Sequence, residues 1–135
     1  MNKTAILVVS HSKILALGVK ELASQMARSA DSVWAVGGTE DGDIGTSAPA
    51  ICEALEGALQ TASEVVVLMD LGSAYLNTLA AIEMLDAPLR GRVTLADAPL
   101  IEGAVLAVVA AASGDNAADV RARAEEARDM HKIIS

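Results

Sequence analysis

Short apolar runs alternate with segments of helical spacing along the whole chain. The runs that fit strands are Ala5–Val9, Val33–Val36, Glu64–Met69 and Val93–Ala96. Almost wholly apolar runs of this length are typical of strands that are buried on both faces. The alternation therefore predicts an α/β fold of three layers: an open, mainly parallel sheet, right-handed crossovers, and helices on both faces.

Helical periodicity and capping residues place the helices between these strands. Ser12 is a candidate N-cap of the first helix, and Thr46 or Ser47 of the second, with Pro49 in its first turn. Pro88 and Gly91 are expected to interrupt the chain before the fourth strand. The first helix is expected over Leu15–Met26. The helices after the second are expected over Ser73–Leu85, Ile101–Ala112 and Asp119–Lys132. Since 135 residues suit one core and no linker or repeat is visible, we expect a single domain, residues 1–135.

Composition limits the partners. The net charge of −8 argues against nucleic acid, which requires a basic face, and is compatible with a basic protein partner. Hydrophobic residues make up 53% of the chain but aromatic residues only 1%, so the core is aliphatic, and part of the apolar excess could cover a subunit interface.

The sequence also indicates the cellular compartment. One cysteine, Cys52, excludes an internal disulfide and favours a reducing cytoplasm. The chain starts without a secretory signal pattern, and its longest weakly polar stretch, 103–112, is too short for a bilayer, so we expect no membrane association.

A histidine between two serines, Ser10-His11-Ser12, ends the first run, and Asp70 ends the third. If both strands are central and parallel, the two side chains emerge at one sheet edge, where open α/β sheets carry their chemistry. This predicts that His11 is a nucleophile and that Asp70 fixes its tautomer. The alternatives are a structural histidine and an aspartate that only caps the following turn.

Three loops at that edge could bind a phosphoryl group. Gly72 and Ser73 open a helix, whose free N–H groups favour an anion, and Ser12 follows the histidine. Gly38 and Thr39 follow the second strand and could add donors. Because the chain has neither a Walker-type Gly-Lys-Ser/Thr nor a G-x-G-x-x-G after its first strand, we do not expect it to bind a nucleotide by itself.

Other candidates have plainer interpretations. His131 and Cys52 have no spacing that suits a metal site, so we expect neither a metal nor a cofactor. Glu102 is expected to be a solvated carboxylate in the first turn of a helix. Trp34 and Tyr75 are expected to pack in the interior, although Tyr75 could border the site because it follows Ser73 closely.

Four stretches together resemble a known family. They are Val8-Val9-Ser10-His11-Ser12, Gly45-Thr46, Met69-Asp70-Leu71-Gly72-Ser73-Ala74 and Ala98-Pro99-Leu100-Ile101-Glu102-Gly103. In this order they resemble the IIA-like domain of DhaM, the phosphotransferase subunit of phosphoenolpyruvate-dependent dihydroxyacetone (glycerone) kinase. That domain is related to the mannose-type IIA proteins of the bacterial sugar phosphotransferase system.

The resemblance implies a phosphotransferase with a phosphohistidine intermediate. His11 would accept a phosphoryl group from the phosphocarrier HPr and pass it to ADP on a separate nucleotide-binding kinase subunit, with Asp70 paired to it. The family is commonly dimeric, which implies a homodimer. Some members continue into HPr-like and enzyme-I-like domains, whereas this sequence ends at Ser135.

Two rival functions stay open. A mannose-type IIA domain for sugar uptake would share the chemistry but serve a different acceptor. A non-catalytic, doubly wound binding module would form no phosphohistidine.

Overall fold

The computed structural model describes residues 3–28 and 32–134, so both ends of the expected single domain lie outside it. The strands are β1 (Thr4–Ser10), β2 (Val33–Gly37), β3 (Glu64–Met69) and β4 (Val93–Leu95). The helices are α1 (Lys13–Ala27), α2 (Ala48–Thr61), α3 (Gly72–Met84), α4 (Ala87–Arg90), α5 (Leu100–Ala112) and α6 (Ala117–Glu125), followed by the 3₁₀ turn η1 (Glu126–Asp129).

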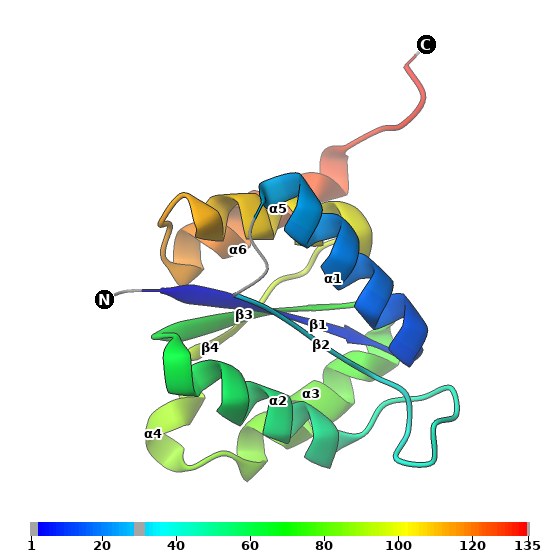
Figure 1. Cartoon of the computed structure of the whole chain (residues 1–135), viewed down its shortest axis with the longest axis vertical. Helices are drawn as coiled ribbons and strands as arrows, with labels where there is room; N and C mark the ends of the chain where they lie inside the picture. Colours follow the sequence, from blue (N-terminus) through cyan, green and yellow to red (C-terminus); the bar gives the residue numbers. More distant parts are fainter. Residues whose placement is uncertain (1–2, 29–31, 135) are drawn as a thin grey trace.

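The sheet confirms the predicted fold class. Its strand order is β2-β1-β3-β4 and every pairing is parallel. The sheet lies between two layers, with α1, α5 and α6 on one side and α2, α3 and α4 on the other (Figure 1). Since β1 and β3 are central and Val9 pairs with Met69, their carboxyl ends meet at one edge.

The core is divided by the sheet because alternate side chains of a strand point to opposite faces. Ile6 and Val8 pack with α1 and α5, whereas Leu7 and Val9 pack with α2. Small residues let the helices lie close to the sheet. A Cβ added at Gly103 of α5 would lie 2.8 Å from Leu68 Cδ2, so only glycine fits there without a shift.

Two local expectations need correction. Pro88 does not merely break the chain, because it lies in the first turn of the short helix α4. The last helix does not reach Lys132: it tightens to 3₁₀ geometry at Glu126, and residues 130–134 are exposed. The buried side of α1 carries Ala16, Val19 and Ala23. Its larger residues Leu15, Leu22 and Met26 face outward because α1 packs closely against α5 through small side chains.

The two aromatic residues behave differently. Trp34 packs against the α2 half of the core, as expected, and lies against Gly57. Tyr75 is exposed rather than packed in the interior, because it lies on the outer side of α3. Within the described residues, no helix combines the length and apolar character needed to cross a membrane.

Candidate functional site

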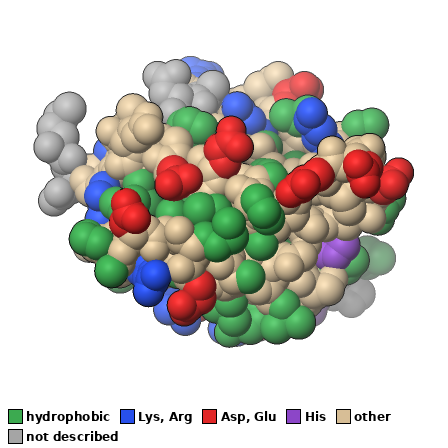
Figure 2. All heavy atoms as spheres, turned by 90° about the horizontal axis from the view of Figure 1, so that it is seen from below, with side chains coloured by type: hydrophobic (Ala, Val, Ile, Leu, Met, Phe, Trp, Pro, Cys, Tyr) green, Lys and Arg blue, Asp and Glu red, His purple; other side chains and the backbone are tan. Residues whose placement is uncertain are grey.

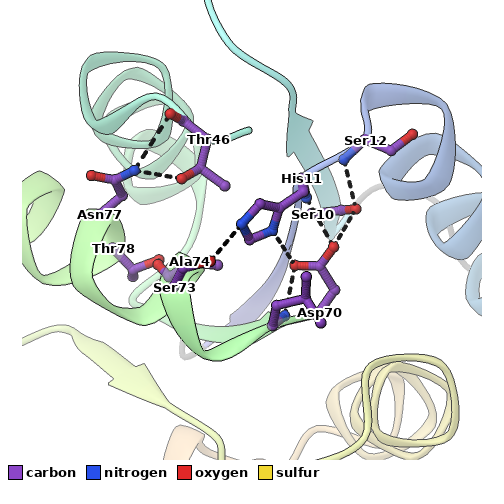
Figure 3. A network of polar contacts seen from close by, with 10 residues as sticks. Ser10, His11, Ser12, Thr46, Asp70, Ser73, Ala74, Asn77 and Thr78 are labelled. Carbon is purple, nitrogen blue, oxygen red and sulfur yellow. Dashed lines mark hydrogen bonds and ion pairs between the residues drawn. The ribbon is translucent and has the colours of Figure 1, made fainter. Parts of the chain in front are cut away.

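His11 lies at the end of β1, where the chain turns into α1. Ser10, which is fully buried, donates its hydroxyl hydrogen to Oδ2 of Asp70 at 2.8 Å and accepts the Ser12 N–H at 3.0 Å. Ser12 caps α1, as predicted, by accepting the Leu15 N–H at 3.2 Å. The two serines therefore shape the turn on either side of the histidine (Figure 3).

Asp70 lies at the end of the neighbouring strand and is held by four hydrogen bonds. Its Oδ2 accepts from the Ser10 hydroxyl and from the backbone N–H of His11 at 2.9 Å. Its Oδ1 lies 2.9 Å from His11 Nδ1 and accepts the Leu71 N–H at 2.7 Å. The predicted contact to the imidazole is therefore present, whereas α3 begins at its N-cap Leu71 without a side-chain capping hydrogen bond.

The charge of Asp70 follows from these contacts. Burial raises the pKa of this carboxyl, but the hydrogen bonds from the His11 backbone, the His11 ring, Ser10 and Leu71 outweigh burial and lower its pKa below the ordinary value. The carboxylate is therefore ionised at neutral pH and can only accept hydrogen bonds.

The tautomer of His11 is fixed by its two ring partners. Because the Asp70 carboxylate only accepts, Nδ1 of His11 carries a proton. In the neutral form of the ring, Nε2 has a free electron pair that can accept the hydroxyl hydrogen of Ser73, whose Oγ lies 2.6 Å away. Nδ1 faces Asp70 and Nε2 faces the start of α3 (Figure 3). A neutral imidazole with a fixed lone pair is a nucleophile.

The site lies at the surface rather than in a cavity. The His11 side chain is 17% exposed, and Ser73 is exposed. A groove of about 740 Å³ lies on the β4 side and is bordered by Asp70, Tyr75 and Arg121, but neither His11 nor Ser73 lines it. An electrophile carried by another protein could therefore reach Nε2 directly.

The predicted phosphoryl-binding residues separate into two groups. Gly72 and Ser73 form the exposed first turn of α3, and Ser73 contacts the ring. Gly38 is buried, with its N–H directed to the Ser10 carbonyl at 3.4 Å. Thr39 makes its hydrogen bonds with Gly42 and Asp43, within its own loop. The backbone N–H groups of Gly38 and Thr39 therefore already donate to carbonyl oxygens.

Sequence reasoning assigned no role at the site to three residues beside the histidine, although two of them form the matching stretch Gly45-Thr46. The N–H of Gly45 donates to the carbonyl oxygen of His11 at 2.8 Å. Asn77 on α3 donates to Thr46, the next residue of the same loop. A backbone N–H leaves no side-chain signature, and Asn77 looks in the sequence like one more polar helix residue.

The remaining candidates lie apart from the site. Glu102, in the first turn of α5, pairs with Lys132 rather than standing free in solvent, and this hydrogen bond lowers its pKa. Cys52 is buried in α2, and burial together with the Glu56 carboxylate raises the pKa of its thiol. In the described part of the chain, no group of three or more His, Cys, Asp or Glu side chains is arranged to hold a metal ion.

Sequence comparisons agree with this geometry. Residues 5–121 match the family EIIA-man, described as "PTS system fructose IIA component". A Providencia stuartii protein named "PEP-dependent dihydroxyacetone kinase, phosphoryl donor subunit DhaM" is 42% identical over 117 residues, which cover 84% of this chain and 24% of that protein. A Listeria innocua protein named as a phosphoryl donor subunit DhaM of the second such kinase is 39% identical over 106 residues, covering 78% of this chain and 83% of that protein. The chain thus spans about a quarter of the longer relative and most of the shorter one.

Solved structures share the fold. One protein of unknown function is 34% identical, with a TM-score of 0.80 over 92% of this chain and 94% of that chain. A phosphotransferase system component EIIA from Streptococcus agalactiae is 16% identical, with a TM-score of 0.67 over 92% of this chain and 91% of that chain. The second likeness concerns the fold alone.

Proposed function

The chain belongs to the EIIA-man family, and from this premise we propose that it is the phosphohistidine relay of a phosphoenolpyruvate-dependent dihydroxyacetone kinase. In this proposal His11 accepts a phosphoryl group from HPr and transfers it to ADP on the nucleotide-binding kinase subunit. The names of the relatives support this acceptor over a sugar transporter, since they are phosphoryl donor subunits of dihydroxyacetone kinases.

One observation carries the proposed chemistry: the His11 ring is held at Nδ1 by Asp70, while Nε2 faces a hydroxyl donor at an open surface. The Nε2 lone pair would form the new N–P bond. The N–P bond of the donor phosphohistidine would break, and its electron pair would stay on the donor nitrogen, so no proton has to move.

The start of α3 would bind the transferred group. Once Nε2 is bonded to phosphorus, the Ser73 hydroxyl is free to donate to a phosphoryl oxygen. The N–H groups and dipole of the first turn, at Gly72 and Ser73, favour the same negative charge. Phosphoryl transfer depends mainly on this kind of positioning and electrostatic stabilisation. Ser12, Gly38 and Thr39 would act only through the shape of their loops.

The surface around His11 suits a docked protein. Three large, exposed apolar side chains lie on the three segments that meet there: Ile14 in the first turn of α1, Ile44 in the β2–α2 loop, and Leu71 after Asp70. The β2–α2 loop also carries exposed Glu40, Asp41 and Asp43. An apolar contact flanked by acidic residues complements a partner whose phosphorylated residue has apolar and basic neighbours.

We further propose a cytoplasmic homodimer in which residues 1–135 of each chain form one domain. The free Cys52 thiol is consistent with a reducing compartment. Hydrophobic side chains gather at the centre of the face formed by α2 and α3 (Figure 2), and Tyr75, Leu76, Leu79 and Met84 on α3 are exposed. A second copy would bury this apolar surface, and sedimentation equilibrium of the purified chain measures the dimer directly.

The test of the relay is the intact mass after incubation with phosphoenolpyruvate, enzyme I and HPr. We expect one acid-labile phosphate on the wild type and none on a folded His11→Ala variant. Addition of the nucleotide-binding kinase subunit with ADP should then remove the phosphate, whereas a transporter IIB domain should not. Labelling of His11→Ala, or no labelling by an active donor, would refute the relay and favour the non-catalytic module.

A further inference from the structure

His11 is held by its backbone as well as by its ring. Its N–H donates to Asp70 Oδ2 at 2.9 Å, and its carbonyl oxygen accepts the N–H of Gly45 at 2.8 Å. The first contact comes from the end of β3 and the second from the end of the β2–α2 loop. The position of the nucleophile therefore depends on where that loop is held.

The loop adopts this conformation because residue 45 is glycine. Gly45 has a φ of +148°, and a Cβ at this position would lie 2.7 Å from Cγ2 of Thr39. The contact from Gly45 to His11 is thus made by backbone alone, and any side chain that controls it must act through a neighbouring residue.

Asn77 is that side chain. Its Nδ2 donates to the backbone carbonyl of Thr46 at 3.4 Å and to the Thr46 hydroxyl. Asn77 lies four residues after Ser73, so both project from the same side of α3. The pair Asn77–Thr46 lies on the Nε2 side of the imidazole, opposite Asp70 (Figure 3). Helix α3 thus contacts the ring directly through Ser73 and holds the His11 backbone indirectly through Asn77, Thr46 and Gly45.

We propose that Asn77 and Thr46 are positioning residues for phosphoryl transfer at His11. Their contact fixes the Gly45 N–H against the His11 carbonyl, and so fixes the distance and angle at which Nε2 meets the incoming phosphorus. In-line transfer is steeply sensitive to this geometry, since a misplacement of about 1 Å can cost roughly a hundredfold in rate. The proposal rests on the proposed function for its kinetic consequence, while the structural contact can be tested separately.

The kinetic test is the single-turnover rate of phosphorylation from phosphorylated HPr. Asn77→Leu, which removes the donor at similar volume, should lower the maximal rate about ten- to a hundredfold and leave the half-saturating donor concentration unchanged. Thr46→Val should show a smaller loss, and Thr46→Ser, which keeps the hydroxyl, should restore the wild-type rate. Asn116→Leu is the matched control because it removes the N-cap of α6, remote from the site, and should cost stability without lowering the rate.

A second readout needs no phosphate. Hydrogen exchange of the Gly45 amide, followed by NMR, should be faster in Asn77→Leu than in wild type or Asn116→Leu. If the wild type accepts no phosphate, the relay fails, and the exchange result alone decides the contact. The positioning proposal is overturned if Gly45 exchange is unchanged, or if folded Asn77→Leu transfers at the wild-type maximal rate. If Asn77→Leu does not fold, equal rates for Thr46→Val and Thr46→Ser overturn it.

Discussion

Asp70 contacts His11 twice, through Oδ1 to Nδ1 of the ring and through Oδ2 to the backbone N–H, each at 2.9 Å. One carboxylate therefore sets both the tautomer of the imidazole and the position of its backbone. Neither oxygen can be replaced by an N–H group without placing a donor against a donor.

Asp70→Asn tests this double contact. With its carbonyl toward Nδ1, the new amide faces the His11 N–H and the Ser10 hydroxyl, so buried donors lose their acceptor at a cost of about 1–3 kcal/mol. With its NH₂ toward Nδ1, the ring must adopt the other tautomer, and Nε2 loses its lone pair. We expect a folded, less stable variant whose phosphorylation is slower by about a hundredfold or more. Denaturant unfolding and intact mass over time measure the two effects, and wild-type behaviour in both would contradict the assignment.

The same carboxylate predicts an acid-dependent loss of stability. The pKa of Asp70 in the folded protein is lower than its ordinary value of 3.8, which applies to the unfolded chain. Above 3.8 both states are ionised and the full stabilisation is present. As the pH falls below 3.8, the unfolded chain binds a proton first, so stability is lost. The difference in unfolding free energy between wild type and Asp70→Ala should shrink between pH 7 and pH 3, and a difference independent of pH would exclude this linkage.

Much of this arrangement can be predicted from the sequence. Apolar runs with a polar residue at their carboxyl end locate His11 and Asp70, and parallel pairing of central strands then brings them to one edge. Glu64–Met69 is a strand with the predicted bounds because both of its faces are covered by helices. Hydrophobic periodicity and capping residues are local features of the sequence, so they can be recognised without knowledge of the tertiary structure.

Other parts depend on backbone groups and long-range contacts that leave no pattern. Arg92 donates to the carbonyls of Leu59, Ala62 and Ser63 at the end of α2, about thirty residues away in the sequence. The N–H of Gly38 donates to a carbonyl oxygen, so this glycine supports the turn instead of binding an anion. Tyr75 faces outward because packing of α3 against α2 and the sheet decides which side of the helix is buried.

Ser73→Ala should separate tautomer control from stabilisation of the phosphoryl group. The variant keeps the contact between Asp70 and Nδ1 but removes the hydroxyl that lies 2.6 Å from Nε2. We expect the histidine still to accept phosphate, with a maximal rate lower by about ten- to a thousandfold, as for the loss of one preorganised donor. Rapid-quench measurement at saturating donor gives the rate. A wild-type maximal rate in Ser73→Thr would support the hydroxyl as the active group. An unchanged rate in Ser73→Ala would show that this hydroxyl takes no part in the transfer.

Gly103→Ala tests the close packing of α5 on the sheet. The added Cβ would lie 2.8 Å from both Leu68 Cδ2 and Ala98 Cβ, so side chains or backbone must shift at a cost of about 1–3 kcal/mol. Gly18→Ala is the matched control, because nothing lies within 4 Å of its Cβ position and helix propensity favours alanine by about 0.5–1 kcal/mol. Thermal unfolding should give melting temperatures that move in opposite directions. An unchanged melting temperature in Gly103→Ala would show that the neighbouring atoms move aside at no cost in stability.

Ile14→Ser tests the docking surface around the histidine. Ile14 is 84% exposed and lies one helical turn from His11, so its apolar side chain gains little from the fold of the isolated chain. A docked donor would bury it, and its loss should raise the half-saturating concentration of phosphorylated HPr about tenfold, equivalent to about 1.4 kcal/mol. The maximal rate should stay near wild type, because the hydrogen bonds of the His11 ring are made by Asp70 and Ser73 and not by Ile14. Ile133→Ser is the matched control, since Ile133 is 86% exposed in the C-terminal segment. Phosphoramidate is a small phosphoryl donor that needs no docking, so it should label His11 equally in the wild type, Ile14→Ser and Ile133→Ser. If Ile14→Ser and Ile133→Ser have equal half-saturating concentrations of phosphorylated HPr, the contact surface lies elsewhere.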